Sequence, residues 1–307
     1  MKTLKVLLVC FLLLSVTAVF GAKDNKVTLV SSSPDVTVLN FETGSYHFKT
    51  VKTINGTAKE LVAPDTGKIL EKGVPGLAKL TASVIVPDEA DMQVQVIDST
   101  FTEIKNIDIA PSKGNILRTV NPDDVPYEYG EAYGKNEFYP TNLAALSSAY
   151  IARDYRGQTV VVNPFRYNPV TKVLRVYSSV TVQVSPTGAA GENTFNRTES
   201  ISAIHPDFEK IYESHFINYS NQTEYTTLPD GFGNMLIVCY NGFMADMAEF
   251  VSWKQSIGYN VSLVDYSTIG SSSALKTYVE NYYNTNGLIY LLLVGDHAQV
   301  PTSSTSA

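Results

Sequence analysis

Three side chains in the last quarter of this 307-residue sequence are of types that can carry out chemistry: Cys239, Asp296 and His297. A thiol beside an imidazole can supply the nucleophile and the general base of a covalent mechanism. A carboxylate at the end of a strand can bind a hard cation, or it can cap the turn that follows. Cys239 lies near the end of an apolar run, and we interpret it as a small hydrophobic residue of the core, which is a common role for a free cysteine.

No other residues form a catalytic or metal-binding pattern. His47, His205 and His215 do not have the spacing of metal ligands, and we interpret them as surface histidines or as histidines with a partner inside the fold. The sequence contains no GxSxG, HExxH or phosphate-loop motif. We therefore assign no catalytic residue to these 307 positions.

The region that carries Asp296 alternates strands with helices. MLIVCY from Met235 is a continuous apolar run, which predicts a strand covered on both faces. NVSLVDY from Asn260 and LIYLLLVG from Leu288 predict a second and a third strand. Residues at helical spacing follow the first two runs: Met244, Met247, Ala248 and Val251 up to Gly258, then Leu275, Tyr278, Val279 and Tyr282 after a cap at Ser272 or Ser273. This βαβαβ order predicts half of a parallel sheet, which binds ligands beyond the carboxyl ends of its strands.

The first two thirds of the chain have a different pattern. From Lys26 to about Pro186 apolar and polar residues alternate, as in strands with one buried face. Residues 165–177 predict a hairpin with Asn168-Pro169 at its turn, and residues 142–155 predict the one short helical or irregular piece. Residues 206–217 predict a short helix that tethers the two regions. We expect an antiparallel β-sandwich.

Composition and the N-terminus indicate export. Two lysines, a short apolar run and small residues at Gly21 and Ala22 are typical of a signal peptide over residues 1–21. No later run is long enough to span a membrane, so we expect a secreted or cell-surface protein. The net charge of −7 argues against nucleic acid as a partner. Cys239 is the only cysteine of the mature chain, which excludes an internal disulfide.

Two stretches resemble a known family. The stretch GNMLIVCYNGFMADMAEFVSWKQSIGYNVSLVDYSTIG and the later LIYLLLVGDHAQVP are similar to the opening of the catalytic domain of gingipains, which are caspase-like cysteine peptidases. The stretch YGKNEFYPTNLAALSSAYIARDYRGQTVVVNPFRYNPVTKVLRVYSSVTVQV resembles the gingipain propeptide, and the region around Gly73 resembles it more weakly. Together these matches cover most of residues 70–302.

The resemblance implies a peptidase precursor. Residues 22–220 would form the β-sandwich prodomain with its tether, 221–232 a linker, and 233–307 an incomplete, caspase-like α/β domain. In the family the catalytic His and Cys follow the LLVGD strand, so we expect them downstream of residue 307. The prodomain would fold and inhibit its own peptidase domain, which in the full-length protein would cut protein or peptide substrates.

The resemblance also suggests roles for single residues. The aspartate of LLVGD, here Asp296, supplies a ligand to a structural calcium ion in gingipains, and its alternative role is a turn cap. If the peptidase cuts after basic residues, its prodomain can block the active-site cleft by presenting a basic residue of its own. Lys113 and Arg118 are the candidates for this residue. The family is often processed after a basic residue at the prodomain boundary, but Asn218–Asn234 contains no Lys or Arg. Processing would therefore occur upstream, at Lys210 or Arg197, or the peptidase would not share the family's preference for cutting after basic residues.

Three functions fit these observations. The chain can be the N-terminal part of a secreted gingipain-like cysteine endopeptidase zymogen. We favour this function because half a sheet with an unpaired edge strand is what a truncated sequence would leave. It can instead be a free-standing, prodomain-type protease inhibitor. The third alternative is a secreted β-sandwich that acts in binding or adhesion, for which the sequence offers no ligand-binding residues.

Overall fold

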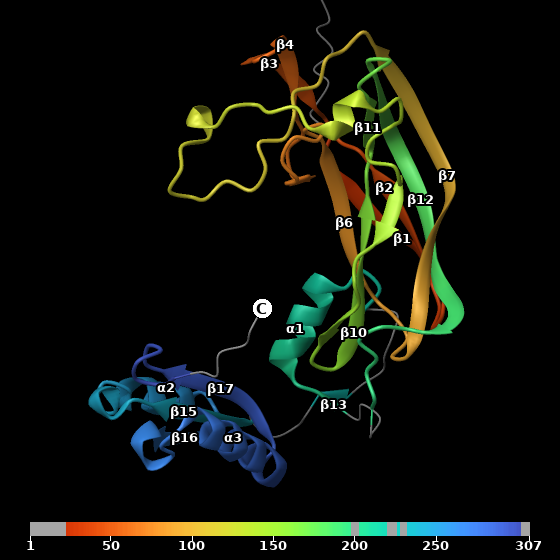
Figure 1. Cartoon of the computed structure of the whole chain (residues 1–307). Helices are drawn as coiled ribbons and strands as arrows, with labels where there is room; N and C mark the ends of the chain where they lie inside the picture. Colours follow the sequence, from red (N-terminus) through yellow and green to blue (C-terminus); the bar gives the residue numbers. More distant parts are fainter. Residues whose placement is uncertain (1–22, 198–202, 220–225, 228–231, 302–307) are drawn as a thin grey trace, which may run out of the picture. The chain divides into compact units, whose positions relative to one another are not determined.

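The structure is a computed structural model that describes residues 23–197, 203–219, 226–227 and 232–301 (Figure 1). The chain divides into two compact units. The first contains the chain up to residue 198 together with residues 213–223, and the second contains residues 199–212 together with 224–307. The predicted signal peptide and most of the predicted linker lie outside the described residues.

The first unit contains two five-stranded sheets whose long strands pair antiparallel. One sheet has the order β1-β2-β12-β11, and β7 also pairs with β12. These strands are β1 (Lys26–Ser32), β2 (Thr37–Glu42), β12 (Val173–Ala190), β11 (Phe165–Asn168) and β7 (Ala90–Lys105). The predicted hairpin at Asn168-Pro169 is confirmed as the connection between β11 and β12, where Asn168 pairs with Val173.

The second sheet of this unit has the order β5-β6-β10-β8, and β9 also pairs with β10. Its strands are β5 (Gly67–Lys68), β6 (Ala78–Ile85), β10 (Tyr155–Val162), β8 (Ala144–Leu146) and β9 (Tyr150–Ala152). A separate hairpin joins β3 (His47–Thr53) to β4 (Gly56–Val62).

The expectation of a short helical or irregular piece over residues 142–155 is wrong for its two strands, β8 and β9. Ala144, Ala145 and Leu146 pair with residues 160–162 of β10, and Leu146 packs against the core. Pairing with a distant strand therefore overrides the local preference of alanine and leucine for helix.

The two sheets of the first unit close on a shared apolar core, which confirms the predicted sandwich. Leu39, Phe41 and Val182 face this core from one sheet, and Val84 and Val160 face it from the other. Each of these side chains is at most 1% exposed. Their neighbours along the strands point away, so the alternation in the sequence is the alternation of the two faces.

Arg156 on β10 is a charged residue that is buried, with 1% of its surface exposed. Its guanidinium donates four hydrogen bonds to main-chain oxygens: those of Pro87 (2.7 Å), Ala90 (2.8 Å), Glu192 (2.7 Å) and Asn193 (3.1 Å). One side chain thus joins the segment that leads into β7 to the segment that leaves β12.

We expect Arg156→Lys to lower the free energy of unfolding of the first unit by roughly 2–4 kcal/mol, because an ammonium group cannot bond all four oxygens and leaves buried acceptors unpaired. Urea unfolding of residues 23–307, followed by circular dichroism, measures this loss. Trp253, the single tryptophan, lies in the second unit, so its fluorescence transition should not move. The exposed Arg153→Lys is the matched control, and equal effects of the two substitutions would contradict the assignment.

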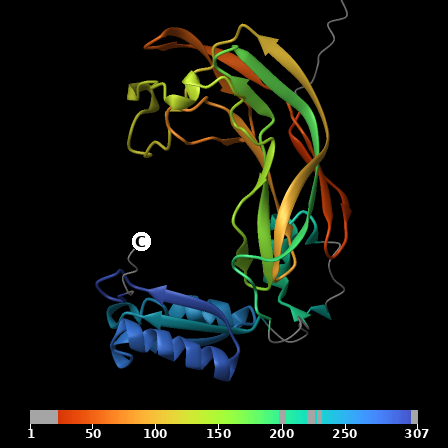
Figure 2. The same ribbon diagram turned by 45° about the vertical axis from the view of Figure 1, so that its right-hand side comes forward.

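The second unit contains a three-stranded parallel sheet of order β16-β15-β17, as the βαβαβ pattern predicts (Figure 2). The elements in chain order are β15 (Asn234–Cys239), η4 (Asn241–Phe243), α2 (Ala248–Ser256), β16 (Asn260–Asp265), η5 (Tyr266–Thr268), α3 (Ser272–Asn286) and β17 (Leu288–Val294). α2 covers the face that carries Ile237, and α3 covers the face that carries Leu236 and Val238.

The cap of α3 differs from the expectation by one residue. Ser271, not Ser272 or Ser273, accepts a hydrogen bond from the main-chain N–H of Ala274 and is the N-cap. A cap needs extended backbone so that its side chain can turn back, and Ser271 has that conformation whereas Ser272 is already helical. In the part of the chain that the structure describes, no helix is long and apolar enough to cross a membrane.

The predicted tether helix is confirmed as α1 (Pro206–His215), which precedes Phe216, Asn218 and Tyr219. Its first residues belong to the second unit and its last residues to the first. Asn218 has no exposed surface, and its side chain bonds both the N–H and the carbonyl of Ile85. The short strands β13 (Ala203–Ile204) and β14 (Thr226–Thr227) pair in parallel within the second unit.

Candidate functional site

A long connection between β7 and β8, residues 106–143, carries both basic residues that the sequence nominates for inhibition. Figure 1 shows this connection in yellow, extending away from the sheets of the first unit. It contains the short helices η1 (Pro122–Asp124) and η2 (Glu131–Gly134). We name two parts of its first half: the loop base (residues 106–112) and the loop tip (residues 113–125).

The loop base is held on both sides by main-chain hydrogen bonds. On one side the N–H of Lys59 donates to Asp108 (2.7 Å), and the N–H of Ala110 donates to Lys59 (2.8 Å). On the other side the N–H of Gly76 donates to Ala110 (2.9 Å), and the N–H of Ser112 donates to the carbonyl of Val74 (2.7 Å). The base therefore behaves as a short strand between β4 and the segment before β6.

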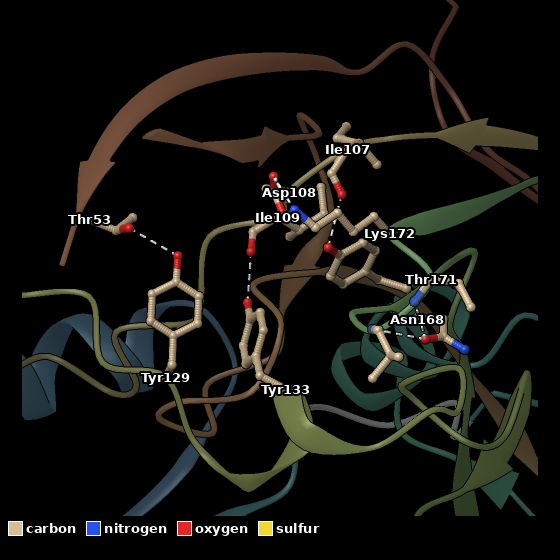
Figure 3. Close-up of polar contacts among 11 residues, drawn as sticks. Thr53, Ile107, Asp108, Ile109, Tyr129, Tyr133, Asn168, Thr171 and Lys172 are labelled. Atoms are coloured by element: carbon tan, nitrogen blue, oxygen red, sulfur yellow. Dashed lines mark hydrogen bonds and ion pairs between the residues drawn. The ribbon is translucent and has the colours of Figure 1, made fainter. Parts of the chain in front are cut away.

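Tyrosine hydroxyl groups add a second set of bonds to the loop base. Tyr133 donates to the carbonyl of Ile109 (2.8 Å), and Tyr167 donates to the carbonyl of Ile107 (2.9 Å) (Figure 3). Burial raises the pKa of Tyr133 and raises that of Tyr167 to about 12, so both groups keep their protons and remain donors at neutral pH. Tyr129 packs edge-on against Tyr133, with ring centres 4.6 Å apart.

The turn between β11 and β12 fixes the other end of the base. Asn168 accepts hydrogen bonds through Oδ1 from the N–H groups of Val170 (3.0 Å) and Thr171 (3.1 Å), as expected for an asparagine at a turn (Figure 3). Lys172 then reaches Asp108 at 2.9 Å, and its carbonyl accepts from the N–H of Ile107. The ion pair is half exposed and contributes little, so the main-chain bond is the firmer link.

Within the loop tip the two candidate basic residues have different surroundings. Lys113 folds inward: its ammonium group donates to the carbonyl of Pro122 (2.7 Å) and lies 4.3 Å from the ring centre of Tyr127. Arg118 is exposed in a turn that the N–H of Val120 closes on the carbonyl of Leu117 (3.0 Å). Among the described residues, none forms a hydrogen bond or ion pair with the Arg118 guanidinium.

The neighbours of Arg118 are apolar and also exposed. Leu117 is 72% exposed and Val120 is 40% exposed, so the turn presents one cation between two apolar side chains. An exposed group of this composition is suited to a pocket on another surface, because the cation supplies direction and the apolar side chains supply buried area.

Cys239 lies in the core of the second unit, as the sequence analysis interprets it. The residue has no exposed surface, and its Sγ is 3.2 Å from the carbonyl of Tyr240, to which it donates. Burial, followed by the charge of Asp265, raises the pKa of the thiol, so the reactive thiolate is disfavoured. His297 is exposed in the turn after β17.

Native Cys239 should react with iodoacetamide at least about 100-fold more slowly than the urea-unfolded protein, because the thiol is buried and protonated. Residues 23–307 contain this cysteine alone, so mass spectrometry of the alkylated protein gives the rate directly. The same protein should not hydrolyse arginyl or lysyl peptide substrates under reducing conditions. Turnover that disappears in Cys239→Ala would show that the thiol is a nucleophile after all.

Asp296 caps the turn that follows β17. Its Oδ1 accepts hydrogen bonds from the N–H groups of Ala298 (2.8 Å) and Gln299 (3.2 Å), and its N–H donates to the side chain of Gln299 (3.0 Å). The turn directs Val300 back into the core beside Gly295, whose φ of +145° favours glycine. The described residues contain no group of three or more His, Cys, Asp or Glu side chains that could hold a metal ion, so Asp296 offers a single carboxylate.

Millimolar calcium should shift the melting temperature of residues 23–307 by less than about 2 °C, because one exposed carboxylate binds calcium weakly. Asp296→Asn should cost about 0.5 kcal/mol or less, since the amide oxygen can accept the same two hydrogen bonds, and Asp296→Ala about 1 kcal/mol. Scanning calorimetry with calcium or EDTA checks both expectations. Strong stabilisation by calcium that Asp296→Asn abolishes would mean that a complete site exists here.

The order of these parts defines a class of protein. An antiparallel β-sandwich with an exposed basic turn, followed in the chain by a parallel α/β sheet, is the arrangement that the resemblance to peptidase precursors implies. Comparison with known proteins specifies the family: Propeptide_C25 matches residues 18–216, and Peptidase family C25 matches residues 229–306. The chain belongs to the gingipain family, with a propeptide followed by the start of the peptidase domain.

The relatives that support this assignment come from Porphyromonas gingivalis. The chain is 37% identical to Gingipain R2 over 289 residues, which cover 92% of this chain and 39% of that protein. It is 36% identical to Gingipain R1 over 291 residues, which cover 93% of this chain and 29% of that protein. A solved structure, the complex of Porphyromonas gingivalis RgpB pro- and mature domains, is similar with a TM-score of 0.59 and 40% identity, covering 64% of this chain and 97% of that one.

Sequence reasoning did not identify the tyrosines that brace the loop base. The sequence did contain a signal for one of them, because Tyr133 begins the Y-x-K-x-x-x-Y-P run that carries the resemblance to the propeptide. In this structure the run contributes a side chain, that of Tyr133, which donates to a carbonyl 24 residues earlier in the chain.

Proposed function

We propose that this chain is the N-terminal part of an exported precursor of a cysteine endopeptidase, and that its first unit keeps the peptidase inactive until the precursor is processed. The chain spans about 39% of the length of Gingipain R2, so the peptidase activity and its protein substrates are inferred from the family. Family membership and the similarity to a complex of pro- and mature domains support the inhibitory relationship.

The exposed turn at Arg118 carries the proposal. The basic side chain of a substrate occupies the specificity pocket of a basic-specific peptidase, and Arg118 can occupy the same pocket. The loop base has few ways to move, since main-chain bonds and two tyrosines hold it. A basic residue presented from a fixed base loses little conformational entropy on binding, which strengthens inhibition.

Lys113, the other candidate, has a different role in this proposal. Its ammonium group is bonded to Pro122 and lies over Tyr127, and therefore closes the loop tip on itself. Binding a peptidase through Lys113 would require both interactions to break. We assign Lys113 to the shape of the tip and Arg118 to contact with the peptidase.

Two further elements of the proposal concern the rest of the precursor. Residues 1–21 have the pattern of a signal peptide and support export to the cell surface or medium. Asp296 lies at the end of a parallel strand and, by family resemblance, contributes one carboxylate to a structural calcium ion whose other ligands lie outside the described residues.

Purified residues 23–307 should inhibit mature Gingipain R2 on an arginyl peptide substrate, and Arg118→Ala should raise the inhibition constant about 100-fold. The expected loss is that of a central arginine anchor in an interface. The inhibition constant of Arg118→Lys should lie between those of the wild type and Arg118→Ala. Lys113→Ala should change the inhibition constant by about tenfold or less, because it affects only the shape of the tip.

Exposed Arg153→Ala is the control for loss of positive charge on the first unit. Circular dichroism establishes that each variant is folded. Equal inhibition by the wild type and Arg118→Ala would refute the assignment of Arg118. A larger loss with Lys113→Ala than with Arg118→Ala would reverse the two roles.

A further inference from the structure

Residues 203–209 belong to the propeptide by sequence and to the second unit by structure. The propeptide match extends to residue 216, yet residues 199–212 group with the α/β sheet. A simple linker would be exposed and polar, with few bonds to either neighbour. This segment instead contains Ile204 and His205, each 3% exposed.

Asp207 makes the firmest polar contacts of the segment. Its Oδ2 accepts hydrogen bonds from the hydroxyl groups of Tyr259 (2.7 Å) and Tyr290 (2.9 Å). Tyr259 directly precedes β16 and Tyr290 lies on β17, so one carboxylate joins both outer strands of the three-stranded sheet. The bond from Tyr259 is the main reason that the pKa of Asp207 is lowered, which keeps this acceptor ionised at neutral pH.

His205 adds two directed hydrogen bonds. Its Nδ1 faces the N–H of Asp207 (3.2 Å), which can only donate, and its Nε2 faces the carbonyl of Phe232 (2.7 Å), which can only accept. The imidazole therefore accepts at Nδ1 and donates from Nε2. It caps the start of α1 with one nitrogen and holds the segment before β15 with the other.

Aromatic packing surrounds these polar groups. Phe208 stacks on Tyr290 with ring centres 5.6 Å apart, and Phe232 stacks on Tyr259 at 5.1 Å. The ring of His205 packs edge-on against Tyr290 at 5.8 Å. Hydrogen bonds to a carboxylate that apolar rings partly shield from water are stronger than exposed ones.

We propose that residues 203–209 are a docking segment by which the propeptide binds the peptidase domain, with Asp207 as the recognised side chain and Tyr259, Tyr290 and Phe232 as its receptor. These contacts are non-covalent and do not depend on the continuity of the chain between segment and receptor. The segment thus supplies a bond between propeptide and peptidase that is separate from the turn at Arg118.

The inference rests on the family division into propeptide and peptidase, and not on inhibition by Arg118. Its experiment uses no peptidase assay, so the two proposals can fail separately. Lys210 is an exposed trypsin site on α1, three residues after Asp207, and trypsin can cut there only when the start of the helix opens. The rate of cleavage at Lys210 in native residues 23–307 therefore reports how firmly the segment is bound.

Asp207→Ala should accelerate cleavage at Lys210 at least about tenfold, because two charge-assisted hydrogen bonds are lost. Glu209→Ala is the matched control: it removes an acid from the same first helical turn, and among the described residues its carboxylate has no hydrogen-bond or ion-pair partner. The control should change the rate less than about threefold, the amount expected from the helix dipole. Mass spectrometry identifies the cut at Lys210.

The tyrosine variants test the receptor without disturbing α1. Tyr259→Phe and Tyr290→Phe should each accelerate cleavage. Tyr259→Phe should have no further effect once Asp207 is alanine, because these two partners act as a unit, whereas the Tyr290 hydroxyl also faces Nδ1 of His205 (3.4 Å). Tyr283→Phe, at a residue that is 61% exposed, is the control. These conservative variants keep the test decisive if Asp207→Ala does not fold. Equal rates for the Asp207, Glu209 and tyrosine variants would refute the docking segment.

Discussion

β7 and β12 pair antiparallel nearly from end to end, from Lys105 beside Val173 to Ala90 beside Ala190. The other side of β12 pairs with β11 and with β2, so this strand pairs with every other strand of its sheet except β1. The loop base begins where β7 ends, beside the turn that begins β12. The backbone bond from Ile107 to Lys172 continues the pairing into the base. The position of the exposed basic turn is therefore a consequence of this long ribbon.

Features that depend on local pattern could be predicted from the sequence. The alternation around Val180, Val182 and Val184 predicted strands with one buried face, and these three valines are at most 1% exposed. The apolar runs from Met235 and Leu288 predicted parallel strands, and both runs form them. Only β15 is buried on both faces, because Leu291 and Leu293 of β17 are 44% and 39% exposed. The first signal is an alternation and the second is a continuous apolar run, and both are local patterns that can be read without knowledge of distant contacts.

Features that depend on distant partners could not be predicted in the same way. Residues 144–146 are good helix formers, but the strand that they form is decided by pairing with residues 160–162 of β10. Sequence also left Lys113 and Arg118 equivalent, because nothing in the composition shows that one cation turns back onto Pro122 and the other does not. The roles of Asp207 and Tyr133 depend on contacts across 52 and 24 positions of the chain.

The arginines of this chain are unevenly available to a protease. The sequence has six, all within the described residues. Arg156 and Arg166 donate to main-chain oxygens, and Arg153, Arg175 and Arg197 form ion pairs with carboxylates. Arg118 is the remaining one. A side chain that is held by hydrogen bonds or by an ion pair can enter the cleft of a protease only after these interactions have broken. Among the described residues, the fold thus leaves one arginine, Arg118, whose guanidinium has no hydrogen-bond or ion-pair partner.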